Sequence, residues 1–204
     1  PTRRNFAVVR LLPDGTPDPS FGKAGLAENT ILSIDTQPLR AVAIQPDGKI
    51  VAAGPAIGPG PTSYDFVVLR YNVNGTLDTT FGNAGATVTD FGNTDDYPRS
   101  VALQPDGRIL VAGQSQTNAM LPTQNFNVAR YNTDGTLDPV WGGDGTVTLD
   151  LGVDYSDFSF ALARQPDSKI VVAGCGFFDS GYKFAVLRYR ADGSLDPAFS
   201  DDGI

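Results

Sequence analysis

The stretch FVVLRYNVNGTLDTTFGNAG, residues 66–85, decides the fold because similar stretches recur along the chain. The other copies begin at Phe6, Phe126 and Phe184, so the spacings are 60, 60 and 58 residues. A second motif keeps the same period, as AIQPDGKIVAAG from Ala43, ALQPDGRILVAG from Ala102 and ARQPDSKIVVAG from Ala163. Self-similarity at a fixed period is typical of repeat architectures. We therefore predict a single repeat domain over residues 1–204, with repeats 6–65, 66–125 and 126–183 and a partial repeat 184–204.

The pattern within a repeat predicts four short strands. The first, Phe66–Asn72, is rich in β-branched and aromatic residues, and the second, Ala86–Phe91, partly alternates apolar with polar residues. Two more are expected at Ser100–Gln104 and Arg108–Gly113, joined by the tight hairpin Pro105-Asp106-Gly107. Since no segment shows a sustained helical period, the fold class is all-β.

Four antiparallel strands in each of about 3.5 repeats predict a β-propeller-type array of four-stranded antiparallel blades. Grouped as blades, the strands fall near residues 41–91, 100–151 and 161–204, with half a blade before them. A closed propeller has about 4–8 blades, so the predicted array is an incomplete ring or a fragment of a larger propeller. Three interpretations stay open: part of a longer array, two copies that complete a ring, or a small open unit. In each, open strand edges would pair with neighbouring repeats or with another copy of the chain.

The double motif also resembles a known family. The pattern F-x-V-x-R-Y-x-x-x-G-x-L-D-x-x-F-G-x-x-G, followed by A-x-Q-P-D-G-K-I-x-V-A-G, is similar to the delta-60 tandem repeat, a bacterial repeat usually assigned to β-propeller-like folds. The resemblance covers essentially the whole chain. It implies a segment of a larger exported protein, extracellular or on the cell surface, and it implies no particular chemistry. The chain departs from the pattern at Ser168, where Gly48 and Gly107 stand in the other copies, and at Arg164, which replaces Ile44 and Leu103.

Composition excludes several classes of function. The chain has no histidine, so Ser-His-Asp and Cys-His catalytic arrangements are impossible. Its single cysteine, Cys175, can form neither an intrachain disulfide nor a thiolate zinc site. The net charge of −8 argues against nucleic acid, and no apolar run is long enough for membrane insertion as a helix.

Three residue types recur once in every repeat. They are an arginine (Arg10, Arg70, Arg130 and Arg188), an aspartate (Asp18, Asp78, Asp138 and Asp196) and an aromatic residue (Phe21, Phe81, Trp141 and Phe199). They could form a ring of ligand-binding charges with stacking platforms for sugars. Alternatively, the aspartate accepts backbone N–H groups in its turn, the arginine bridges strands or pairs bidentately with it, and the aromatic ring packs the turn onto the blade. We favour the structural interpretation, because a catalytic residue is needed once whereas a fold-holding residue is needed in every unit.

Candidate binding residues lie in the segments that differ between repeats, residues 55–65, 114–125 and 175–183. Function in repeat scaffolds concentrates on variable loops. The apolar and aromatic residues of these predicted loops are Tyr64, Met120, Phe177, Phe178 and Tyr182.

Acidic clusters leave calcium open as a cofactor, although none matches the regular calcium-binding loop. The clusters are Asp90 with Asp95 and Asp96, Asp150 with Asp154 and Asp157, Asp144, and Asp201 with Asp202. Solvated acidic loops are the simpler interpretation, so we expect no cofactor and no metal site.

The predicted function is that of a non-enzymatic repeat segment, serving as a structural scaffold or as an adhesion or protein-interaction module. The partner would be neighbouring repeats, another copy, or a protein or glycan ligand. A carbohydrate- or calcium-binding module is the alternative, and a carboxylate-dependent glycoside hydrolase is the less favoured one.

Overall fold

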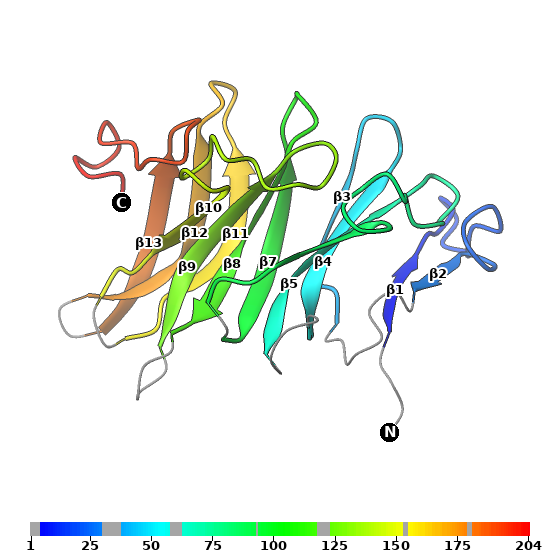
Figure 1. The fold of residues 1–204 in the computed structure, drawn as a ribbon, viewed down its shortest axis with the longest axis horizontal. Helices are drawn as coiled ribbons and strands as arrows, with labels where there is room; N and C mark the ends of the chain where they lie inside the picture. The colour runs from blue at the N-terminus through cyan, green and yellow to red at the C-terminus, as the bar shows by residue number, and fades with distance from the viewer. Residues whose placement is uncertain are drawn as a thin grey trace.

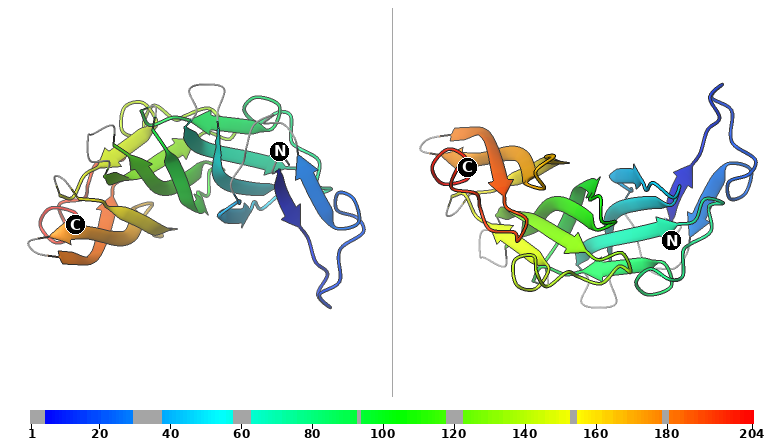
Figure 2. Two further views of the ribbon diagram at one scale, coloured as in Figure 1. Left: turned by 90° about the horizontal axis from the view of Figure 1, so that it is seen from below. Right: turned by 90° about the horizontal axis from the view of Figure 1, so that it is seen from above.

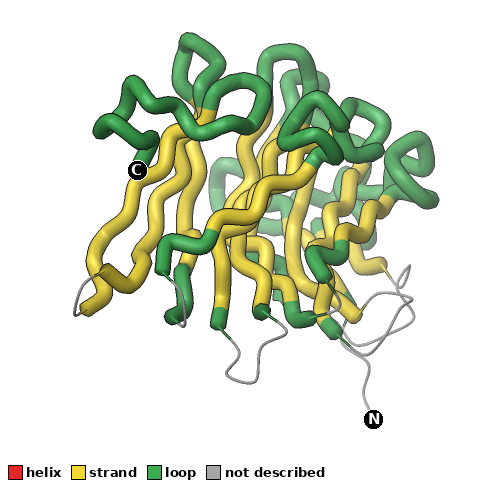
Figure 3. The backbone as a smooth tube through the Cα atoms, turned by 60° about the vertical axis from the view of Figure 1, so that its left-hand side comes forward, coloured by secondary structure: helices red, strands yellow, loops and turns green. Residues whose placement is uncertain are grey.

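The computed structural model describes residues 5–29, 38–57, 63–92, 94–117, 123–152, 155–178 and 181–204. Within these ranges the regular secondary structure is β-strand throughout (Figure 3), which confirms the all-β prediction.

The strands form four antiparallel sheets, which we call blades 1 to 4 in chain order (Figure 1). Blade 1 contains β1 (Phe6–Val9) and β2 (Leu26–Asn29). Blade 2 contains β3 (Ala41–Ile44), β4 (Ile50–Ile57), β5 (Tyr64–Tyr71) and β6 (Ala86–Thr89). Blade 3 contains β7 (Asp96–Leu103), β8 (Ile109–Gln116), β9 (Gln124–Tyr131) and β10 (Thr146–Leu149). Blade 4 contains β11 (Phe158–Arg164), β12 (Ile170–Phe178) and β13 (Gly181–Tyr189).

The blades follow one another along an open arc, with blade 1 at one end and blade 4 at the other (Figure 2). Blades 2 and 3 are complete four-stranded meanders, in which neighbouring strands are consecutive in sequence. In the described part of the chain, blade 1 has two strands, blade 4 has three, and the arc does not close into a ring. The predicted blades and the half-blade that precedes them are therefore confirmed.

The strands of the long hairpins run further than the sequence predicts. β4 pairs with β5 as far as Ile57 and Tyr64, and β12 pairs with β13 as far as Phe178 and Gly181. The ends of these strands contain polar residues, glycines and Pro55, which are typical of loops. Hydrogen bonds to the partner strand nevertheless keep these residues in the extended conformation. The placement of the candidate binding residues in loops is thus wrong for Tyr64, Phe177, Phe178 and Tyr182, which lie in strands, and Met120 falls outside the described residues.

Successive blades pack through an aromatic side chain that meets a glycine. Phe66 of β5 is fully buried against Gly113 of β8, where a Cβ atom would lie 2.7 Å from Phe66 Cζ. Only glycine admits such a close approach. The same pairing recurs as Phe6 with Gly54 and Phe126 with Gly174. Buried apolar clusters fill the spaces between the blades around these contacts.

The predicted hairpin at Pro105-Asp106-Gly107 is present, with Gly107 at a φ of 86° and its N–H donating to the Gln104 carbonyl. Ser168 occupies the equivalent position with a φ of 68°, a left-handed conformation that a non-glycine residue adopts at a cost. The hairpin therefore keeps its left-handed turn residue although serine replaces glycine.

Candidate functional site

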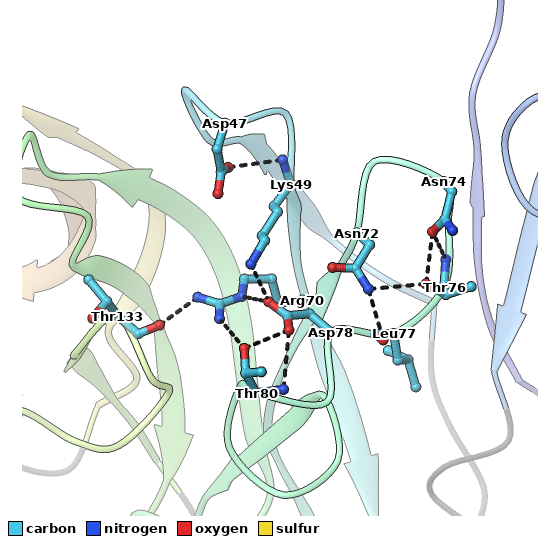
Figure 4. Close-up of polar contacts among 10 residues, drawn as sticks. All are labelled: Asp47, Lys49, Arg70, Asn72, Asn74, Thr76, Leu77, Asp78, Thr80 and Thr133. Atoms are coloured by element: carbon cyan, nitrogen blue, oxygen red, sulfur yellow. Dashed lines mark hydrogen bonds and ion pairs between the residues drawn. The ribbon is translucent and has the colours of Figure 1, made fainter.

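The repeated motif builds a turn after β1, β5, β9 and β13, and Figure 4 shows the turn after β5. In blade 2 the chain reverses after β5 at Asn74-Gly75, with Gly75 at a φ of 84° and its N–H donating to the Asn72 carbonyl. Asn74 Oδ1 accepts hydrogen bonds from the backbone N–H and the hydroxyl of Thr76. This side-chain turn explains why asparagine or aspartate precedes the glycine in every copy.

Asp78 lies at the centre of the turn and is 4% exposed. Its Oδ2 accepts hydrogen bonds from Arg70 Nε at 2.7 Å and from Lys49 Nζ at 2.8 Å (Figure 4). Its Oδ1 accepts the backbone N–H of Thr80 at 3.1 Å and the hydroxyl at 2.7 Å. The structural role predicted for this aspartate is present, but the bidentate pair is wrong, since only one guanidinium nitrogen of Arg70 points at Asp78.

The hydrogen bonds to Asp78 favour its charged form. Burial by itself raises the pKa of a carboxyl, but the bonds from Lys49, Thr80 and Arg70 outweigh it and hold the pKa of Asp78 well below its usual range. Asp78 is therefore an anion at any neutral pH, and it is neutralised by two cations.

The guanidinium groups of Arg10, Arg70 and Arg130 each reach the next blade through a second nitrogen, Nη1. Arg70 Nη1 donates to the Thr133 carbonyl at 2.5 Å, and the guanidinium lies over the Phe81 ring, with Cζ 4.6 Å from the ring centroid. The equivalent bonds join Arg10 to the Val73 carbonyl and Arg130 to the Ala191 carbonyl. This reach is the reason for the single bond to Asp78, because the guanidinium divides its donors between its own turn and the following one.

A second hydrogen bond joins the same pair of turns. The backbone N–H of Gly82 donates to the Asp134 carbonyl at 2.6 Å, and Gly135 comes so near that a Cβ atom would lie 2.7 Å from Gly82 N. Equivalent bonds run from Gly22 to Asn74 and from Gly142 to Asp192. We call the arginine bond and this bond together the blade clasp.

The aromatic residues at the repeated position pack the turns, as predicted. Phe21, Phe81 and Trp141 are fully buried, and Phe199 in the last repeat is half-buried. A ring without exposed surface cannot stack against a sugar, so the first three are not binding platforms.

The outer face of blade 4 is the largest departure from the repeat. Phe184 of β13 is 97% exposed, whereas Phe66 and Phe126, at the same position in blades 2 and 3, are 0% exposed. Within the described residues, Arg188 keeps its bond to Asp196, but no carbonyl accepts a hydrogen bond from its Nη atoms. The arginine donor of a blade clasp is therefore in place on blade 4, and in the described residues it lacks its acceptor.

A hollow of about 640 Å³ lies on this face. Phe177, Phe178, Phe184, Val186 and Ile204 are among its lining residues. Nearby, Phe177 stacks on Tyr155 with ring centroids 3.6 Å apart and meets the ring of Tyr182 edge-on at 5.5 Å.

The structure thus gathers three of the predicted binding residues, Phe177, Phe178 and Tyr182, at one end of the array. It places Tyr64 elsewhere, with its ring 6.2 Å from that of Tyr97 at the junction of blades 2 and 3. The sequence-based list of binding residues does not include Phe184. Its position in the last copy of the motif could have indicated that no further blade covers it.

One group of carboxylates in the described residues is close enough to share a metal ion. It consists of Asp65, Asp90 and Asp96, and the sequence predicts only the last two as members of one cluster. Asp65 was missed because it lies on β5, far from the other two in sequence. Asp95, the other member of the predicted cluster, instead accepts hydrogen bonds from the Tyr64 backbone N–H and the Tyr97 hydroxyl.

Blades of four antiparallel strands, stacked around an arc by a recurrent interface, define a β-propeller-type repeat protein. The described part of the chain contains no helix that could cross a lipid bilayer. The sequence profile of a domain of unknown function described as a β-propeller, DUF5122, matches residues 2–21, 45–81, 104–139 and 165–199. The chain belongs to this family, which is the delta-60 type of repeat, so the resemblance seen in the sequence is confirmed. No curated protein matches the chain. A repeat domain of this class supports a structural or interaction module.

Proposed function

We propose that the chain is a non-enzymatic scaffold module that binds a further blade of its own repeat type on the outer face of blade 4. The observation that carries the proposal is the exposure of Phe184, 97% against 0% for Phe66 and Phe126. At each internal junction this phenylalanine is covered by the glycine strand of the following blade. The same strand is therefore the occupant that fits the face by shape.

The polar groups of the face fit the same occupant. Arg188 Nε donates a hydrogen bond to Asp196 Oδ2 at 2.8 Å. Because the guanidinium group is planar and rigid, this bond orients the Nη atoms of Arg188 as it does those of Arg70 and Arg130. At the internal junctions these Nη atoms bind a carbonyl of the next turn. The partner must therefore present a turn carbonyl beside a glycine strand, which is what a blade of this family supplies.

Such an interface is heterologous, since the two surfaces that meet are different. Heterologous contacts extend in one direction, into a ring if the rotation closes and into an array if it does not. The partner can be a repeat of a longer chain or of another polypeptide. A location outside the cell or on its surface, and a role in adhesion, remain predictions, which protease treatment of intact cells and binding assays would test.

The test adds a further blade to the outer face of blade 4. Residues 86–145 are appended after Gly203, because residues 184–203 correspond to residues 66–85 and the added segment then continues the repeat in register. In the extended chain we expect Phe184→Ala to lower the free energy of unfolding by about 3–5 kcal/mol, the cost of removing a buried phenylalanine. In the 204-residue chain the same change is expected to stay within about 0.5 kcal/mol, as for other exposed positions.

The control is Val42→Ala, since Val42 is 62% exposed and lies on the far blade 2, and it should have little effect in both chains. Equal, small effects of Phe184→Ala in both chains would show that the face does not receive a blade. Should the 204-residue chain form dimers that Phe184→Ala dissociates, the occupant is a second copy instead.

The aromatic group beside the hollow favours a carbohydrate ligand as a second candidate. Sugars bind to exposed aromatic faces, and Tyr155 is 45% and Tyr182 55% exposed. A glycan array would test this candidate, with Tyr182→Ala as the variant that loses binding. No bound glycan, or binding that survives the substitution, would exclude it.

A further inference from the structure

The three carboxylates at the junction of blades 2 and 3 come from separate elements. Asp65 lies on β5, Asp90 directly follows β6, and Asp96 opens β7. One oxygen from each lies within 4.8 Å of the other two. Since calcium binds oxygen at about 2.3–2.6 Å, two of its ligand atoms can be up to about 5 Å apart, so these oxygens can share one ion.

Asp96 has a buried oxygen that nothing in the described structure satisfies. The residue is 0% exposed, its Oδ2 accepts the backbone N–H of Phe91 at 2.8 Å, and its Oδ1 is buried without a hydrogen-bond partner. Among the residues described, no lysine or arginine nitrogen pairs with it. A buried carboxylate oxygen without a donor is costly, and a cation is one of the few groups that can satisfy it.

The electrostatic environment adds to this cost. Asp65 and Asp96 are 6% and 0% exposed, and Asp90 adds a third carboxylate to the same group. Negative charges that crowd a buried position repel one another, and a cation bound between them removes the repulsion.

The next junction repeats the arrangement with one change. Asp157 is also fully buried, its Oδ2 accepts the Leu151 N–H at 2.6 Å, and its Oδ1 lacks a hydrogen-bond partner in the described structure. Asp150 corresponds to Asp90, and Asn125 stands at the position of Asp65. The buried oxygen thus recurs, whereas the number of carboxylates falls from three to two.

We propose that Asp65, Asp90 and Asp96 bind a divalent, oxygen-seeking cation of the calcium type, which joins blade 2 to blade 3. Asp90 is exposed and gives the ion a route from solvent. Three carboxylates supply only part of the six to eight oxygens of a calcium site, so water and backbone carbonyls complete the shell. Magnesium binds more weakly here, because it requires shorter, nearly octahedral contacts and loses water reluctantly. This inference is independent of the proposed blade-binding face.

The test titrates calcium chloride into chelator-treated protein by calorimetry and follows the melting temperature in parallel. We expect one saturable site and a melting temperature that rises with calcium, since a ligand that binds only the folded state stabilises it. Asp96→Asn and Asp90→Asn should each weaken calcium binding at least tenfold. Asp90 is exposed, so Asp90→Asn keeps the test valid even if Asp96→Asn disturbs the fold.

The matched control is Asp14→Asn. It removes one negative charge from an exposed turn at the position where the next repeat has Asn74, so the fold should accept it. Calcium affinity should then stay within twofold of the unmodified chain. The proposal is overturned by the absence of heat and of any melting shift at millimolar calcium, and equally by a similar loss in Asp14→Asn and Asp90→Asn.

Discussion

Replacing Asp78 by alanine tests whether the repeated turn is a structural device. The substitution removes the acceptor of four hydrogen bonds, from Arg70 Nε, from Lys49 Nζ, and from the N–H and hydroxyl of Thr80. The Arg70 guanidinium then stays buried without its carboxylate. Removal of one partner from a buried ion pair costs about 3–5 kcal/mol.

The expected loss lies at the lower end of this range. Arg70 keeps its bond to the Thr133 carbonyl and its contact with the Phe81 ring, and the Lys49 side chain is 30% exposed. We therefore expect the free energy of unfolding to fall by about 3 kcal/mol. For a chain of this size the melting temperature would fall by about 6–12 °C.

Urea unfolding, followed by circular dichroism and by the fluorescence of the single tryptophan, measures the effect. Trp141 follows β9 in the turn of blade 3, which Arg70 binds, so coincident transitions from the two probes show that blades 2 and 3 unfold together. Asp78→Asn is the first control; it retains an acceptor for Thr80 and should cost less than alanine.

Asp18→Ala is the second control, because Asp18 makes the same contact with Arg10 at a more exposed site. In the described residues no lysine pairs with it. Its loss of stability should be clearly smaller than that of Asp78→Ala. Equal losses at the two positions would refute the burial argument, and an Asp78→Ala protein that melts normally but loses a ligand would refute the structural role.

Three further predictions follow from the same geometry. Because the pKa of Asp78 is lowered in the folded protein, its contribution to stability is fully present above the usual value of 3.8 and declines as the pH falls from there towards the lowered pKa. The difference in urea midpoint between the unmodified protein and Asp78→Ala should therefore shrink from about pH 5 to about pH 2.5, and a constant difference would contradict this. Gly113→Ala should lower the free energy of unfolding by about 1–3 kcal/mol or more, because the new methyl group meets Phe66 and backbone atoms, whereas Gly181→Ala, with no atom within 4 Å, should unfold at nearly the same urea concentration as the unmodified chain. Ser168→Gly should raise the melting temperature, since it relieves a left-handed serine worth about 1–2 kcal/mol and loses part of that gain to the greater freedom of glycine when unfolded; a lower melting temperature would show that the serine is not strained.

The sequence predicted the blades well because the information is local. The hairpin at Gly107 and the turn at Asn74-Gly75 each depend on a few adjacent residues, and repetition at a constant spacing showed which elements belong to one unit. The structural interpretation of Asp78 rested on the same repetition.

What the sequence could not predict depends on contacts between blades. The hydrogen bond from Arg70 to Thr133 joins residues 63 positions apart, and the sequence around neither residue predicts it. The grouping of Asp65 with Asp90 and Asp96 likewise requires β5, β6 and β7 to meet. The sequence around Phe184 matches that around the buried Phe66 and Phe126, so it predicts a core residue. Phe184 is exposed because its blade lies at the end of the arc.

The blade clasp has a consequence for how such chains change over generations. Arg10 contacts a carbonyl at Val73, and Arg70 contacts the equivalent carbonyl at Thr133, so donor and acceptor are the same at each junction. After deletion of residues 66–125, Arg10 would meet the Thr133 carbonyl, and the two blades would form an interface of the existing type. Recombination between the copies in a gene can therefore add or remove whole repeats while every interface stays intact, and repeat number becomes a trait that varies freely without loss of the fold.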